Sequence, residues 1–100
     1  MRALAGFLAV VGLAAGCATA AMIPHATAVE AQKSGVGLET LEHGRGLFLA
    51  RCGNCHMTPD PGSRSAEQWA LILPEMREDS HLSDAEASQV LAFLQALAPN

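Results

Sequence analysis

The stretch ARCGNCHM, residues 50–57, holds two of the three cysteines in this chain of 100 residues. Cys52 and Cys55 are separated by two residues, and His56 follows the second cysteine directly. A Cys-x-x-Cys-His sequence is compatible with three kinds of site: a redox disulfide, one half of a zinc site, or a point of covalent haem attachment. The surrounding sequence has to decide among them, because the motif alone does not.

Three stretches around the motif have helical periodicity. Apolar residues at roughly helical spacing predict a helix over residues 38–51, which runs into the motif. A second helix is predicted to open at Ser65, with Gln68 completing a capping box, and a third at Ser83, with Glu86 in the same role. No segment alternates as a half-buried strand would, so the sequence predicts an all-α fold.

The predicted domain is small for an ordinary apolar core. About sixty residues in three short helices bury little apolar surface, and the whole chain has one Trp and three Phe. Pro74 falls inside the second helical pattern, where it is expected to kink or end the helix. A disulfide, a metal or a large apolar cofactor is therefore expected to complete the fold.

Two of the three interpretations of the motif fit this context poorly. A thioredoxin-like redox pair lies in a βαβ setting, whereas this motif is predicted at the end of a helix with no strands nearby. A structural zinc ion needs four ligands, and His43 and His81 are the candidates for the fourth. The adjacent side chains of Cys55 and His56 diverge, which makes them awkward ligands of one zinc ion.

Covalent haem c fits the context of the motif. Two thiols one helical turn apart can reach the two vinyl groups of a haem, and the following histidine can bind the iron. The haem would also supply the missing apolar core. The sequence therefore predicts one haem c, attached through thioethers to Cys52 and Cys55 and ligated on its proximal side by His56.

Residues 1–21 have the three parts of a secretory signal peptide: a basic start, the apolar run ALAGFLAVVGLAAG and a small-residue end. Within this segment LAAGC resembles a bacterial lipobox, in which case residues 1–16 are the signal and Cys17 becomes the lipidated N-terminus. Cleavage after the Ala-Thr-Ala of residues 18–20 is the alternative, and it would remove Cys17. Both routes predict export to the periplasm, with membrane attachment only through a lipid on Cys17.

Residues 22–37 mix Pro, Gly and Ser with scattered apolar residues and have no period. They are interpreted as a linker before a domain that covers residues 38–100. From Met22 onward the chain has five basic and ten acidic residues, which gives a net charge of five minus ten, or −5. This charge disfavours nucleic acid and anionic lipid headgroups as partners. It is compatible with docking on a basic patch of another protein, but a merely soluble acidic surface is the favoured interpretation for a chain this small.

The chain resembles the monohaem class I cytochromes c over residues 38–98, where one helix runs into Cys-x-x-Cys-His and the LSDAEASQVLAFLQAL helix closes the domain. The resemblance implies a small cytochrome c-like fold in which three main helices wrap around one covalently bound haem. It also implies that the first and last helices cross closely through a small residue and an aromatic one. Gly44 with Phe48, against Phe93 and Leu94, match those positions.

The sixth iron ligand is expected on the second helix. Met76 lies on one apolar stripe with Trp69, twenty residues after His56, and a thioether ligand raises the reduction potential. In the commonest class I pattern the methionine lies much further along the chain, just before the last helix, so this sequence departs from it. His81 stands closer to that place and is the alternative ligand, which would lower the potential.

Four further residues are expected around the haem. A proximal histidine usually donates its second ring N–H to a backbone carbonyl, and the carbonyls of Pro59 and Pro61 are the candidates to accept it from His56. Trp69 and Arg64 are candidates for hydrogen bonds to a haem propionate. Plain packing for Trp69 and a surface charge for Arg64 are the alternative roles.

The resemblance extends to the short haem domains that accept electrons from periplasmic dehydrogenases, such as the cytochrome subunits of sulfite dehydrogenases and the haem domains of quinohaemoprotein amine dehydrogenases. It implies an electron carrier that is not itself an enzyme, takes electrons from a dehydrogenase and passes them to an oxidase or another cytochrome of a respiratory chain. The alternative is a gas-binding, gas-sensing or peroxidase-like haem domain with an open or displaceable sixth site.

Overall fold

The computed structural model describes residues 23–52 and 58–99, and every regular element within these two ranges is helical. The prediction of an all-α fold is confirmed for this part of the chain. The expected signal peptide, Cys17, Cys55 and His56 lie outside the described residues. The elements are α2 (Ala28–Ser34), α3 (Leu38–Leu47), the π-helix η2 (Phe48–Cys52), the 3-10 helix η3 (Pro61–Ser63), α4 (Ala66–Ser80) and α5 (Asp84–Leu97).

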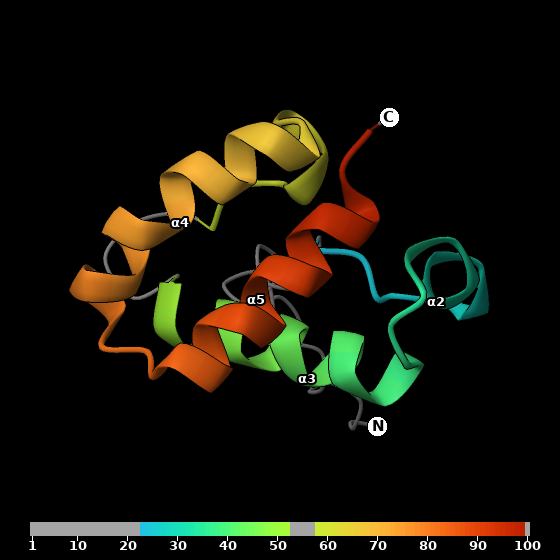
Figure 1. Ribbon diagram of the computed structural model, residues 1–100, viewed down its shortest axis with the longest axis horizontal. Coiled ribbons are helices and arrows are strands. Elements are labelled where there is room, and N and C mark those ends of the chain that lie inside the picture. Colours follow the sequence, from blue (N-terminus) through green and yellow to red (C-terminus); the bar gives the residue numbers. More distant parts are fainter. Residues whose placement is uncertain (1–22, 53–57, 100) are drawn as a thin grey trace, which may run out of the picture.

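Helix α5 is the central element of the fold. It packs against α3, α4, α2 and η3, and Figure 1 shows it between α4 on one side and α3 on the other, with α2 at the far end. On its buried face Val90, Phe93 and Leu94 are fully buried. The central position of α5 therefore follows from the most apolar helical stripe in the described chain.

Capping boxes fix the starts of three helices. The Ser65 hydroxyl accepts a hydrogen bond from the Gln68 backbone N–H at 3.1 Å, and the Gln68 side chain accepts one from the Ser65 N–H at 2.8 Å. Ser83 and Glu86 make the same pair of bonds at the start of α5, which confirms both predicted helix starts. A third box, Thr27 with Glu30, opens α2.

The first predicted helix is present, but its last turn is wider than an α-helical turn. Helix α3 ends at Leu47, and the π-helix η2 continues it to Cys52. A π-turn holds an extra residue and so rotates the residues that follow around the helix axis. The widened turn therefore sets the side of the helix on which Cys52 lies.

Pro74 does not end α4, which continues from Ala66 through Pro74 to Ser80. The helix has 15 residues, so of the two predicted outcomes, an end or a kink at Pro74, the end is wrong. A proline ring removes the N–H that would bond the carbonyl four residues earlier, which here belongs to Ala70. Both residues are exposed, so water can hydrogen-bond this carbonyl and the loss is small.

The helices α3 and α5 approach each other at Gly44, as the family resemblance implied. A Cβ atom at Gly44 would overlap the carbonyl group of Gln89 and lie 3.1 Å from the Cβ of Phe93. Phe48, one turn further along, places its ring 6.1 Å from the Phe93 ring and 6.4 Å from the Trp69 ring. Three aromatic rings from three different elements thus form the centre of the core.

Residues 23–37, here named the N-terminal strap, fold onto the helices and do not form the expected linker. Ile23 and Ala26 are 4% and 6% exposed and belong to the apolar core. Helix α2 follows them and packs against α5 and α3. The strap is therefore part of the folded domain, whose described residues begin at Ile23.

Two polar side chains on α3 hold the strap in place. Glu42 accepts a hydrogen bond from the Ala26 backbone N–H at 2.7 Å, and its other oxygen lies 2.7 Å from Nδ1 of His25. Arg45 donates to the backbone carbonyl of Ile23 at 2.7 Å and to that of Pro24 at 3.1 Å. The non-helical backbone of the strap thus finds its hydrogen-bond partners on α3.

We predict that Gly44→Ala destabilises the protein by about 1–3 kcal/mol, because its methyl group has to displace the backbone of α5. Gly46→Ala is the matched control, since nothing lies within 4 Å of a Cβ there. It should stabilise α3 by about 0.5–1 kcal/mol. Urea unfolding followed by circular dichroism measures both, and equal effects of the two substitutions would contradict the close crossing.

We predict that the strap loosens in acid. The hydrogen bond with His25 is the largest cause that lowers the pKa of Glu42 below its ordinary 4.5. Because the folded-state pKa is the lower one, this stabilisation is complete above the unfolded pKa and is lost as the pH falls through the folded pKa. The protection of the Ala26 amide against hydrogen exchange, relative to the intrinsic exchange rate at each pH, should fall over that range, and Glu42→Gln should abolish this fall. Glu39→Gln, on the exposed first turn of α3, should leave it unchanged.

Candidate functional site

Cys52 is the one motif cysteine among the described residues, and it is the last residue of η2. Its side chain is half-buried, and its Sγ lies 3.7 Å from the hydroxyl of Ser80 at the end of α4. Burial raises the pKa of the Cys52 thiol above its ordinary value. The first cysteine of the motif therefore lies against the C-terminal turn of α4. Cys55 and His56 lie in residues 53–57, outside the described part of the chain.

One face of α4 is turned toward this point. Met76 precedes Ser80 by four residues and follows Trp69 by seven, spacings that place all three on one side of a helix. Trp69 is fully buried, and Met76 is half-buried against the apolar core. Because Ser80 contacts Cys52, the Met76 side chain lies on the α4 face nearest to the motif.

His81 occupies a different environment from Met76. It is the C-cap of α4, with a left-handed backbone at φ 56°, and its side chain is exposed. Its backbone carbonyl accepts a hydrogen bond of 3.3 Å from Arg51, the residue before Cys52. The backbone of His81 is thus close to Arg51 and Cys52, but its side chain is exposed, whereas Met76 is half-buried.

Arg51 links the motif helix to the start of α5. Its guanidinium lies 3.2 Å from the carboxylate of Glu86, the residue that completes the capping box of Ser83. The hydrogen bond from the Ser83 backbone, aided by the charge of Arg51, lowers the pKa of Glu86. This pair ties the end of η2 to α5 next to Cys52.

Trp69, which was expected to contact a propionate, contacts both Pro61 and Arg64, two other residues expected around the haem. The indole Nε1–H of Trp69 donates to the carbonyl of Pro61 at 2.9 Å, and the guanidinium carbon of Arg64 lies 5.2 Å from the centre of the indole ring. The Trp69 N–H therefore already has a partner, which differs from its expected bond to a propionate. Pro59 is half-buried just before this turn.

Asp60 and Ser80 are two residues of this region that the sequence analysis missed. The carboxylate of Asp60 accepts a hydrogen bond from the Gly62 N–H at 3.1 Å, which shapes the turn that presents the Pro61 carbonyl to Trp69. Asp-Pro-Gly is a recognisable turn sequence and could have revealed this. The contact of Ser80 with Cys52 spans 28 residues, and no local pattern reveals it.

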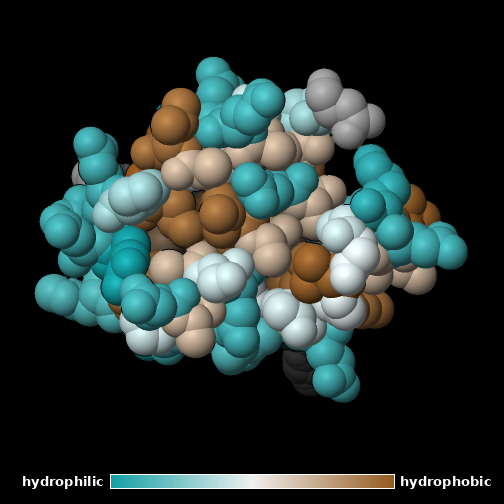
Figure 2. Space-filling model, viewed as in Figure 1, coloured by the Kyte–Doolittle hydropathy of each residue, from teal (hydrophilic) through white to brown (hydrophobic). Residues whose placement is uncertain are grey.

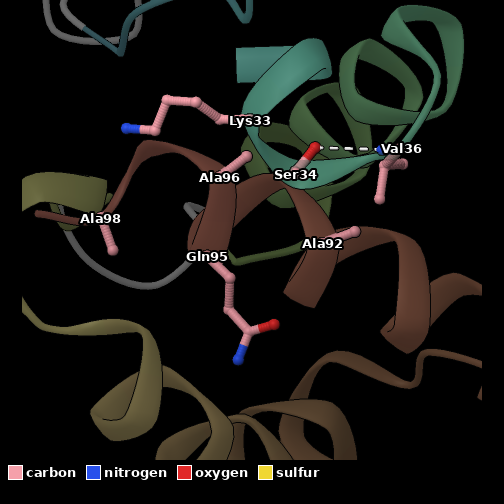
Figure 3. A pocket seen from close by; sticks show the side chains of 7 residues that line it. All are labelled: Lys33, Ser34, Val36, Ala92, Gln95, Ala96 and Ala98. Carbon is pink, nitrogen blue, oxygen red and sulfur yellow. Dashed lines mark hydrogen bonds between the residues drawn. The ribbon is translucent and has the colours of Figure 1, made fainter. Parts of the chain in front are cut away.

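Three hollows lie among the described residues away from the motif, since neither Cys52 nor Met76 lines them. One of about 330 Å³ lies between α2 and α5, where Lys33, Ser34 and Gln95 line it (Figure 3). A second, of about 590 Å³, is an open depression beside α2. The third, of about 290 Å³, is an apolar groove between α4 and α5.

Two further findings bear on the expected site. Within residues 23–52 and 58–99, no group of three His, Cys, Asp or Glu side chains could hold a metal ion. Of the zinc candidates, His43 lies 2.7 Å from the side chain of Gln89 and links α3 to α5. No helix among the described residues is long and apolar enough to cross a membrane.

Comparisons with protein-family models, with curated proteins and with solved structures found no match for this chain.

We predict that Trp69→Phe destabilises the protein by about 1–2 kcal/mol, because the buried carbonyl of Pro61 loses its donor. Arg64→Gln is the comparison: it removes the cation above the ring and should cost about 0.5–1 kcal/mol. Trp69 is the only tryptophan of the chain, so circular dichroism replaces fluorescence as the probe. A smaller decrease in the free energy of unfolding for Trp69→Phe than for Arg64→Gln would contradict this prediction.

Proposed function

We propose that this chain is a haem c protein that carries single electrons in the periplasm. The observation that supports it best is the position of the motif: Cys52 ends a helix that packs on α5 through Gly44, and its sulfur faces the Met76 side of α4. This arrangement fits the crossing that the cytochrome c resemblance implies. It also places a half-buried thioether side chain near the motif.

We assign the motif residues the following roles in holding a covalent haem. Cys52 and Cys55 supply the two thioether attachments, and His56 supplies the proximal nitrogen. When bound, the haem iron supplies one-electron exchange between its ferric and ferrous states. The apolar residues Trp69 and Phe48, both fully buried, exclude water from this part of the core.

Met76 is the proposed distal ligand. It is half-buried among apolar residues, whereas the ring of His81 faces solvent. A thioether is a weakly hydrated ligand that suits an apolar site, and it favours a raised reduction potential. His81 stays the competing ligand, because its backbone carbonyl accepts a hydrogen bond from Arg51, the residue before Cys52.

The proposed location is the periplasm, and the folded strap affects how a lipid anchor would act there. If Cys17 is lipidated, only residues 18–22 separate it from Ile23, the first described residue, which is buried in the core. Six residue steps span at most about 20 Å. A lipid on Cys17 would therefore hold the domain close to the membrane, where the expected linker through residue 37 would have allowed a far longer reach.

The proposed partners are a dehydrogenase that donates electrons and an oxidase or second cytochrome that accepts them. The acidic charge of the chain favours basic docking surfaces on both. No catalytic role is proposed for the chain itself, although it can serve as a subunit of an oxidoreductase.

We predict that the protein, matured in a host with cytochrome c assembly, gains the mass of one haem, and that Cys52→Ala strongly lowers this yield. Met76→Ala should abolish the methionine-to-ferric charge-transfer band in the near infrared and lower the reduction potential. His81→Ala, the matched control, should leave both unchanged.

Three results would contradict the proposal in different ways. A protein without covalent haem would reject it entirely. Loss of the low-spin spectrum in His81→Ala but not in Met76→Ala would reassign the ligand. Tight binding of CO to the native ferrous protein would favour the gas-binding or peroxidase-like alternative.

A further inference from the structure

We propose that the outer face of α4 and its groove with α5 form a docking surface for a basic partner protein that inserts an apolar side chain. The groove has a volume of about 290 Å³. Figure 2 shows apolar side chains gathered between α4 and α5 with hydrophilic residues around them. The groove is lined by Ala70, Leu73, Pro74, Arg77, Asp84, Ala87, Ser88 and Leu91.

Leu71 extends the apolar part of this surface. Its side chain is 78% exposed, the highest fraction of any large apolar residue in the described chain. Pro74, three residues later, is exposed on the same side and also lines the groove. An exposed leucine that continues an apolar groove has the form of the apolar centre of a protein interface.

Acidic residues surround this apolar centre. Glu67 and Glu75 stand four residues before and after Leu71, so they flank it on the helix surface, and Glu78 follows one turn later. All three are exposed. A partner that covers Leu71 is therefore brought into contact with carboxylates on both sides.

The negative charge of this face is not neutralised by the nearby basic residues. Among the described residues, Arg77 pairs with Asp84, Arg51 pairs with Glu86, and Arg64 lies over Trp69. No ion pair within residues 23–52 and 58–99 involves the carboxylates beside Leu71. The excess of acidic over basic residues in the chain is thus concentrated, in part, on the outer side of α4.

The negative charge beside Leu71 indicates which kind of partner this surface can bind. A second copy of this chain would bring carboxylates against carboxylates, and a nucleic acid or an anionic membrane would be repelled. A partner with lysine or arginine side chains around one apolar side chain would pair with the carboxylates beside Leu71 and place the apolar side chain in the groove. The surface does not depend on a haem, since Leu71 and Met76 are five residues apart and point roughly 140° away from each other around the helix.

The mature full-length protein, labelled with nitrogen-15, can be titrated with a synthetic helical peptide that carries one leucine ringed by lysines. We expect amide shifts over residues 67–78 and along the groove side of α5, and weaker binding as salt is raised. The same peptide with serine in place of leucine should bind about tenfold more weakly, as should the variant Leu71→Ser. Glu75→Lys should also weaken binding about tenfold, whereas Glu39→Lys, an equal charge change on α3, should weaken it less than about twofold.

Each of four results would overturn the proposal. Shifts spread evenly over the surface, or equal effects of Glu75→Lys and Glu39→Lys, would mean that net charge alone attracts the peptide. If the serine peptide bound as tightly as the leucine peptide, no apolar side chain would be inserted into the groove. A concentration-dependent dimer that Leu71→Ser dissociates would assign the surface to a second copy of the chain. Circular dichroism of each variant confirms that it is folded before it is titrated.

Discussion

The backbone contact between α3 and α5 at Gly44 is the constraint on which the other parts of this structure depend. Without a side chain at Gly44, the carbonyl of Gln89 can approach α3 directly. That approach lets Phe48 reach both Phe93 and Trp69, which joins α4 to the other two helices. Since Cys52 is four residues after Phe48 on the same continuous helix, its contact with Ser80 follows from the same crossing.

The strap shows how hydrogen bonding decides whether a segment of mixed composition folds. Residues 23–27 have no regular structure, so their backbone groups need partners from elsewhere. Glu42 and Arg45, three residues apart on α3, supply them with a carboxylate and a guanidinium. Burial of Ile23 adds an apolar contribution. These two charged side chains of α3 would otherwise face water, and they bind the segment of the chain that precedes α3.

Local sequence patterns predicted the helices. The features that they did not predict depend on contacts between residues far apart in the sequence. The starts at Ser65 and Ser83 follow from sequence spacing alone. The strap depends on pairings between residues 16 to 22 positions apart, which no window of sequence contains. For the candidate site, the half-buried Met76 agrees with its apolar stripe. The bond from the Trp69 indole to Pro61 depends on a turn whose geometry was not anticipated.

Helix α4 has an inner, apolar side and an outer, acidic side. Its inner stripe, with Trp69 and Met76, belongs to the core and the proposed haem site, while Leu71 and Glu75 face outward. The capping box at Ser65 and the left-handed C-cap at its other end fix the helix at both ends. The arginines nearest the motif are already paired with acidic residues of α5, so the unpaired carboxylates of α4 remain on its outer side. A basic partner would therefore bind α4 on the side that faces away from Met76, the proposed ligand. Helix α4 itself would be the shortest covalent connection between the bound partner and the proposed haem site.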